Sequence, residues 1–193
     1  KGEIEFPDSF NNAIFAIKEQ TNNKILIGGS FTTFNSINQN RIIRLNSDGT
    51  KDSTFSIGTG FNSTVWDIDL QNDKIIAVGN FISYNSISSN KIVRLNSDGN
   101  LDTSFNIGTG FYFPGSAIIN NITIQSDNKI IIAGIFESFN STPINNFLRL
   151  ENNGLLDNSF NTGYELYDNN NINENKSTTR TVVGLGRVAQ ARR

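Results

Sequence analysis

The strongest constraint on the fold of this 193-residue chain is an internal repeat. A run that begins with lysine, continues with aliphatic residues and ends in a Gly-x-Phe step occurs at residues 24–31, 74–81 and 129–136. Each run is followed by an aromatic-Asn-Ser step, an Arg-Leu step, a glycine-centred turn and an Asp-x-(Ser/Thr)-Phe step. The second Arg-Leu step follows the first by 50 residues, and the third follows the second by 55. Such a period is typical of arrays in which each copy is one supersecondary unit.

Each copy contains four short segments with the character of β-strands. In the middle copy these segments are residues 64–71, 74–81, 91–96 and 101–106. The second segment is apolar on both faces, which predicts a central strand buried on both sides. No apolar stripe of helical period extends over ten residues, so we expect almost no helix. We therefore predict an all-β fold of three four-stranded antiparallel repeats, each with the geometry of a β-propeller blade.

Three blades do not close a ring, because propellers typically contain about 4–8 blades. An open arc has two unpaired edges, and residues 4–10 resemble the last strand of a preceding blade. The chain is then a piece of a longer protein, one half of a six-bladed ring formed by two chains, or an arc with covered edges. We expect residues 1–164 to form the repeat region and residues 165–193 to form an Asn-rich linker and a basic tail.

The absence of histidine, cysteine and methionine removes several classes of chemistry. Ser-His-Asp and Cys-His centres need histidine, and zinc and haem sites normally use histidine, cysteine or methionine as ligands. The net charge of −2 gives no general attraction for nucleic acid or an anionic membrane. No apolar run approaches the ~20 residues of a membrane span. We expect no catalytic residue, no metal or cofactor, no nucleic-acid ligand and no membrane span.

Four recurring steps carry a resemblance to a known family. They are a Gln-x-(Asp/Asn)-Lys-Ile turn, a Gly-Gly-x-Phe step, an Arg-Leu-Asn-x-Asp-Gly turn and an Asp-x-Ser-Phe strand, between Phe6 and Phe160. In these steps the chain resembles the delta-60 repeat family, whose members are predicted propellers of the WD-repeat kind. The resemblance implies the propeller fold and carries over no catalytic residue. The chain departs from the family at residues 72–74 and 127–129, where the glycine that usually follows the aspartate is absent.

Polar residues that recur in every copy are interpreted as structural. In each copy an arginine precedes an aspartate by eight residues, and the pairs are Arg44 with Asp52, Arg94 with Asp102 and Arg149 with Asp157. We expect an Arg–Asp contact or an Asp-capped turn in each blade. The alternative is a calcium loop at residues 46–52 and its copies, because calcium prefers oxygen ligands. The Gly-Thr-Gly-Phe steps lack the strand–loop–helix setting of a phosphate-binding loop and are interpreted as links between blades.

Residues that differ between the copies are the better candidates for a ligand site. On the first strand of the middle copy, Trp66, Asp67 and Asp69 would form a sugar-binding patch of one stacking ring and two acceptors. The alternatives are a buried Trp66 with two solvated aspartates, and a hydrolase that would need two opposed carboxylates.

An aromatic run occupies the five-residue insertion between the second and third copies. Phe111, Tyr112 and Phe113 would lie on a blade-connecting loop, where contacts with partners are common. The run is interpreted either as a contact for a protein partner or as local packing over the propeller face.

The leading functional hypothesis is a non-enzymatic structural or interaction scaffold. Its contacts would come from blade-connecting loops and edge strands, with a protein partner or a second copy of the chain. A carbohydrate-binding propeller and a carboxylate-dependent hydrolase are the alternatives. We expect an extracellular, cell-surface or virion location. Residues 178–193 contain four arginines and no acid, and are interpreted as a flexible end or as a basic peptide that docks on a partner or on nucleic acid.

Overall fold

The computed structural model describes residues 9–160, and these lie within one compact unit of the chain. The predicted basic tail and most of the predicted leading strand lie outside the described residues. Within the described part there are sixteen β-strands and no helix, which confirms the all-β prediction. No helix in this part is long and apolar enough to cross a membrane.

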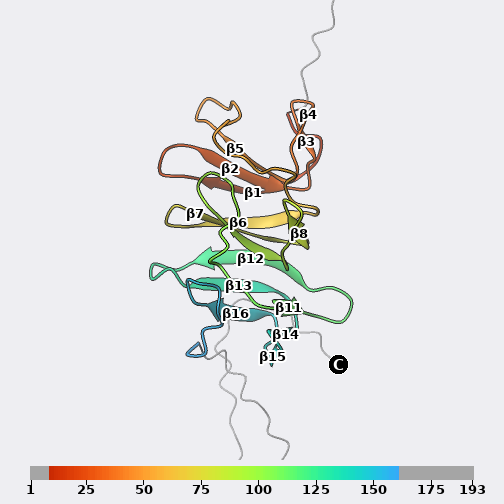
Figure 1. Cartoon of the computed structure of the whole chain (residues 1–193), viewed down its shortest axis with the longest axis vertical. Helices are drawn as coiled ribbons and strands as arrows, with labels where there is room; N and C mark the ends of the chain where they lie inside the picture. The colour runs from red at the N-terminus through yellow and green to blue at the C-terminus, as the bar shows by residue number, and fades with distance from the viewer. Residues whose placement is uncertain (1–8, 161–193) are drawn as a thin grey trace, which may run out of the picture. The chain divides into compact units, whose positions relative to one another are not determined.

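Each repeat forms one three-stranded antiparallel sheet, and the three sheets follow one another from the red to the blue end of the colour range (Figure 1). The first sheet has the order β1 (Ile14–Glu19), β2 (Ile25–Gly29), β5 (Ile42–Leu45). The second has the order β6 (Val65–Gln71), β7 (Lys74–Gly79), β10 (Ile92–Leu95). The third has the order β12 (Ile118–Ile124), β13 (Ile130–Ile135), β16 (Phe147–Leu150). The central strand β7 is buried on both faces, as its continuous apolar run predicts.

The fourth strand of each blade is shorter than predicted. It consists of one isolated bridge in each repeat, namely Leu45–Lys51, Leu95–Leu101 and Leu150–Leu156. Directly after this bridge in the middle blade, Asp102 Oδ1 accepts the backbone N–H of Ser104 at 3.1 Å. This local bond competes with a continued ladder and turns the chain away from the sheet. The blades therefore keep the predicted order of segments, with a reduced fourth segment.

Short hairpins outside the main sheets explain the aromatic-Asn-Ser steps. The strands are β3 (Thr33–Phe34), β4 (Ile37–Asn38), β8 (Ser83–Tyr84), β9 (Ile87–Ser88), β11 (Phe111–Tyr112), β14 (Ser138–Phe139) and β15 (Thr142–Pro143). In the middle blade, Asn85 and Ser86 join β8 to β9 with φ angles of 47° and 65°. Two successive positive φ angles are typical of a type I′ turn, which suits a two-residue hairpin. These hairpins are not among the strands that the sequence predicts.

A glycine lies at the end of β2 and β7, and one residue before the end of β13, because the inner strand of each blade bulges toward it. In the middle blade the register of β6 against β7 shifts between Val65 and Asp67. A Cβ atom on Gly79 would lie 2.1 Å from the carbonyl oxygen of Thr64. The bulge therefore leaves no room for a side chain, and this accounts for the glycine in the repeated Gly-x-Phe step.

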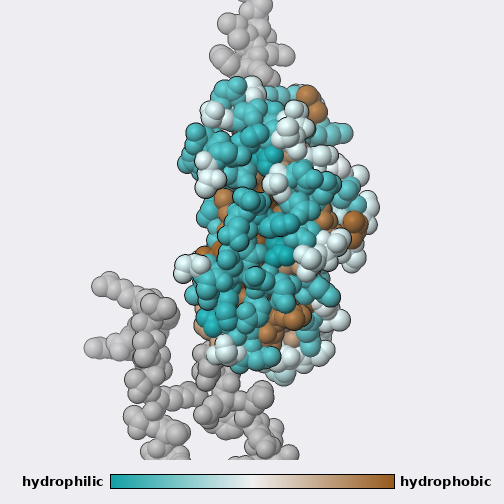
Figure 2. Space-filling model, turned by 60° about the vertical axis from the view of Figure 1, so that its left-hand side comes forward, coloured by the Kyte–Doolittle hydropathy of each residue, from teal (hydrophilic) through white to brown (hydrophobic). Residues whose placement is uncertain are grey.

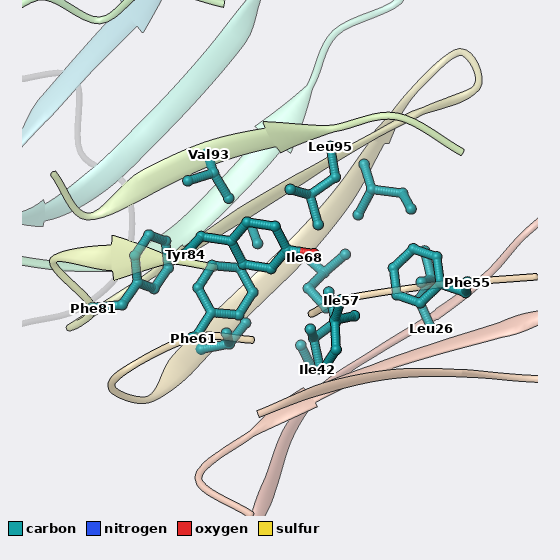
Figure 3. Close-up of a cluster of buried hydrophobic side chains, with 14 residues drawn as sticks. Leu26, Ile42, Phe55, Ile57, Phe61, Ile68, Phe81, Tyr84, Val93 and Leu95 are labelled. Atoms are coloured by element: carbon teal, nitrogen blue, oxygen red, sulfur yellow. The ribbon is translucent and has the colours of Figure 1, made fainter. Parts of the chain in front are cut away.

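Two apolar clusters hold the blades together face to face. In the first cluster, Leu26 and Ile42 of the first blade lie in one buried group with Ile68 and Val93 of the second blade (Figure 3). The segment between the blades adds its own side chains, Phe55, Ile57 and Phe61, to that cluster. A second cluster joins the second and third blades in the same way. On the face shown in Figure 2, hydrophilic residues predominate and hydrophobic residues form separate patches.

Candidate functional site

The most concentrated set of charged side chains in the middle blade surrounds Asp102. Arg94 Nε lies 2.9 Å from Asp102 Oδ2, and Lys74 Nζ lies 3.3 Å from the same oxygen. The other carboxylate oxygen accepts a hydrogen bond from Ser104 Oγ at 2.7 Å. The guanidinium carbon of Arg94 lies 4.8 Å from the centre of the Phe105 ring, in cation–π geometry. We call this arginine, aspartate, lysine and phenylalanine the ion-pair cluster of the blade.

The same ion-pair cluster is present in the other two blades. The Arg–Asp distances are 2.6 Å for Arg44 with Asp52 and 2.7 Å for Arg149 with Asp157. The lysine positions correspond as well, with Lys24 at 2.6 Å from Asp52 and Lys129 at 2.8 Å from Asp157. The structure thus brings together all six repeated arginines and aspartates as pairs, and it combines the Arg–Asp contact with the Asp-capped turn.

The arginines also link each blade to the next. Arg44 Nη1 donates to the carbonyl oxygen of Ser97 in the second blade, and Arg94 Nη1 donates to that of Asn152 in the third. Beside them, the amide of Ser56 donates to the carbonyl oxygen of Asp98 at 2.8 Å. One guanidinium therefore neutralises an aspartate within its own blade and binds the backbone turn of the following blade.

A glutamine at the end of the inner strand completes the contact. Gln71 Oε1 accepts from Arg94 Nη1 at 2.8 Å, and Gln71 Nε2 donates to the carbonyl oxygen of Asn128 in the third blade at 2.6 Å. Gln125 Oε1 accepts from Arg149 at 3.3 Å. This role is not predicted by the sequence, although a glutamine occurs at the same place in every copy, at Gln20, Gln71 and Gln125. Among the described residues, the equivalent Gln20 Oε1 is buried without a hydrogen-bond partner.

The three repeats match a known family. The family is described as a domain of unknown function (DUF5122) beta-propeller, and its model matches residues 20–55, 70–105 and 125–160. Each match ends at the phenylalanine of an ion-pair cluster, and together the matches cover more than half of the chain. This chain belongs to that β-propeller repeat family. A comparison with the curated proteins finds no match for it.

The ion-pair clusters lower the pKa values of the aspartates of this propeller repeat. For Asp102, burial opposes ionisation, but hydrogen bonds from Ser104 and Lys74 and the charge of Arg94 hold its pKa well below the ordinary value. For Asp52, burial is likewise outweighed by hydrogen bonds from Lys24, Thr54 and Arg44, and its pKa is also well below the ordinary value. These carboxylates are therefore ionised acceptors and are poorly suited to act as general acids.

The lowered pKa values predict that the propeller repeats lose stability in acid. An aspartate with a lower pKa in the folded chain contributes its full stabilisation above the ordinary value of 3.8, and this stabilisation declines as the pH falls toward the folded value. We expect the free energy of unfolding, measured with urea, to fall steadily below about pH 4. Asp67 has a raised pKa and acts in the opposite direction, but the pKa values of five other aspartates are lowered, namely those of Asp48, Asp52, Asp98, Asp102 and Asp157. Stability that rises below pH 4 would contradict this account.

The predicted ligand residues Asp67 and Asp69 bond to the neighbouring blade. Asp67 Oδ2 accepts the amide of Ile122 at 3.0 Å, and Asp69 Oδ2 accepts the amide of Ile124 at 2.7 Å. Asp69 Oδ1 also lies 2.5 Å from Lys18 Nζ of the first blade. Burial raises the pKa of Asp67, and the two backbone hydrogen bonds that it accepts only partly oppose this effect. Both carboxylates thus connect inner strands of neighbouring blades.

Trp66, on the same strand as the two aspartates, packs on an aromatic ring of the first blade. Its ring centroid is 4.4 Å from that of Phe15, which is 45% exposed. The indole Nε1 is buried and has no hydrogen-bond partner among the described residues. The structure therefore places Trp66 in a half-buried aromatic pair between two inner strands.

The aromatic run of the insertion divides between the core and the surface. Phe111 is buried and packs on Phe136 at a centroid distance of 5.1 Å. Phe113 packs against the same cluster, whereas Tyr112 is 60% exposed. Of the three predicted contact residues, only Tyr112 is therefore available to a partner.

The calcium alternative is not supported by the geometry of the first turn. Asp48 Oδ1 accepts from the backbone and the hydroxyl of Thr50, at 2.9 and 2.6 Å, while Asp52 bonds to Arg44 and Lys24. In residues 9–160 no group of three or more acidic residues is arranged to hold a metal ion. The turn is stabilised by its own hydrogen bonds.

Proposed function

We propose that this chain is a non-enzymatic structural or interaction scaffold made of propeller repeats. One observation carries the proposal: the charged groups common to all blades are used in contacts within and between blades. Arg94 illustrates this, since it binds Asp102 and Gln71 and reaches the backbone of Asn152 in the next blade. Catalytic groups are usually concentrated at one site with matched partners, whereas these groups recur at equivalent places and rigidify the array.

Exposed apolar side chains on the hairpins and connections support contact with a protein partner. Ile37 on β4 is 65% exposed, Ile87 on β9 is 50% exposed and Tyr112 on β11 is 60% exposed. Tyrosine is enriched in protein interfaces because it buries a large apolar area and keeps a polar group for hydrogen bonding. We propose that the partner is bound at the connection that carries Tyr112.

The finer classification is also a proposal. The recurring steps support a repeat of the delta-60, WD-like kind, and a scaffold of this type would suit an extracellular, cell-surface or virion location. The sugar-binding alternative retains the Phe15–Trp66 pair, but the two aspartates are used by backbone amides of the next blade. The hydrolase alternative would need two opposed carboxylates, whereas Asp67 and Asp69 lie on one strand and accept backbone amides of the next blade.

Photo-crosslinking at position 112 tests the partner contact. The chain carries benzoylphenylalanine in place of Tyr112, and a matched control carries it in place of Thr21, in an exposed turn. In an extract of the source organism we expect a discrete crosslinked species from position 112 and none from position 21. Excess wild-type chain should compete for this species, and Tyr112→Ser should compete poorly.

Two other results would contradict the scaffold proposal. One is hydrolysis of a chromogenic glycoside that the wild-type chain performs and Asp67→Asn does not. The other is a saturable change in the fluorescence of Trp66, the single tryptophan, when neutral oligosaccharides are added, with no crosslink at position 112. The first result would assign a hydrolase and the second a carbohydrate-binding propeller.

A further inference from the structure

We infer that the open face of the third blade docks head to tail on the first blade of a second copy of this chain. The contacts would be those that already join successive blades. The inference rests on the proposed scaffold function and names one partner for it. The structure shows the same contact between successive blades twice, between blades one and two and between blades two and three. We call this contact between two blades a joint.

Each joint has a donor side and an acceptor side. The donor side presents Nη1 of the arginine of the ion-pair cluster and the backbone amide of the residue after the cluster phenylalanine. These residues are Arg44 and Ser56 in the first joint, and Arg94 and Asn106 in the second. The acceptor side presents two successive backbone carbonyl oxygens of the glycine-centred turn. They belong to Ser97 and Asp98 in the first joint, and to Asn152 and Asn153 in the second. Any blade with an open donor face is therefore complementary to any blade with an open acceptor face.

The third blade carries an open donor face. Phe147 on β16 occupies the position of Ile42 on β5 and Ile92 on β10. The latter two side chains are 0% and 2% exposed because the next blade covers them, whereas Phe147 is 40% exposed. The side chain of Arg149 is 19% exposed, against 6% for Arg44. Among the described residues, no carbonyl oxygen of a following blade accepts from Arg149.

The first blade carries the matching acceptor face. The carbonyl oxygens of Ser47 and Asp48 accept no hydrogen bond from the described residues. Ile17 on β1 is 67% exposed, whereas its equivalent on β6, Ile68, is 3% exposed. A Cβ atom on Gly99 would lie 2.5 Å from the carbonyl oxygen of Ser56 in the preceding blade, whereas a Cβ atom on Gly49 would meet nothing within 4 Å.

Charge complementarity favours the same pairing. In the first joint the pKa of Asp98 is lowered by its hydrogen bonds with Asn100, and the charge of Arg44 lowers it further. Asp48 holds the place of Asp98 on the open acceptor face, and Arg149 holds the place of Arg44 on the open donor face. Two copies joined at both ends would form a ring of six blades, which lies within the usual range for propellers.

The test is the mass of the full chain measured by light scattering on a sizing column. We expect twice the chain mass of 21.3 kDa for the wild type. Phe147→Ser damages the donor face, and Gly49→Asn obstructs the acceptor face while asparagine tolerates the positive φ of 82°. Each variant should halve the mass. Ile82→Ser, which removes a side chain that is 61% exposed just before β8 of the middle blade, should leave the mass unchanged.

Mixing the two variants separates head-to-tail docking from other dimers. Phe147→Ser retains an intact acceptor face and Gly49→Asn an intact donor face, so the mixture should recover dimers joined through one interface. The fluorescence of Trp66 reports that each variant is folded. A wild-type monomer would overturn the inference, because the two faces would then not bind a second copy of the chain. A dimer that neither variant affects would also overturn it. Neither result would remove the crosslink expected at position 112, which tests the scaffold proposal separately.

Discussion

Asp102→Ala is expected to lower the free energy of unfolding by about 3–5 kcal/mol, the cost of removing one partner from a buried ion pair. The substitution leaves the guanidinium of Arg94 in a buried site without its carboxylate. It also removes the cap on the Ser104 amide and the counter-charge of Lys74. Urea unfolding followed by Trp66 fluorescence measures the change.

Asp73→Ala is the matched control for this substitution. Asp73 is exposed in the turn before β7, and it has no ion pair among the described residues. Asp73→Ala removes the same formal charge as Asp102→Ala, and we expect it to change the free energy of unfolding by no more than about 0.5 kcal/mol. Equal effects of the two substitutions would mean that the loss of net charge, and not the ion-pair cluster, determines the stability.

Phe81→Ala is expected to lower the free energy of unfolding by about 3–5 kcal/mol, as is typical for removing a large buried aromatic side chain. Phe81 is 0% exposed and packs on Phe61 at a centroid distance of 4.4 Å. Phe61 belongs to the segment that joins the first and second blades, so the cavity would lie where the two blades meet (Figure 3). Thermal and urea unfolding should show the loss.

The adjacent residue provides the control for the aromatic substitution. Ile82→Ala removes an apolar side chain that is 61% exposed, and we expect the free energy of unfolding to change by less than about 0.5 kcal/mol. If Phe81→Ala lowers the free energy of unfolding by less than about 1 kcal/mol, the contact between the blades contributes little to stability.

The sequence predicts the elements of this fold whose signals are local or recur. The continuous apolar run of β7 indicates a central strand, and the eight-residue spacing of Arg94 and Asp102 places them on neighbouring segments. The hairpins β8–β9 depend on positive φ angles at Asn85 and Ser86. An Asn-Ser step is a weaker hairpin signal than Asn-Gly, which explains why these hairpins were missed.

Contacts between blades could not be predicted from the sequence. The bond from Arg94 to Asn152 spans 58 residues and is made to a backbone oxygen, so no residue type marks it. For the same reason, the acceptor roles of Asp67 and Asp69 appear only when β12 is placed beside β6. The exposure of Tyr112 between two packed phenylalanines likewise depends on the pairing of β11 with β14.

The most direct test of a structural role for the repeated Arg–Asp pair is a double-mutant cycle on Arg94 and Asp102. The free energies of unfolding of Arg94→Met, Asp102→Ala and the double variant are measured under the same conditions. We expect the double variant to lose less stability than the sum of the single losses, by about 1–3 kcal/mol, because each single variant leaves a buried charge unpaired. Losses that add to within about 0.5 kcal/mol would contradict a structural pair and would leave the repeated charges without the role assigned to them.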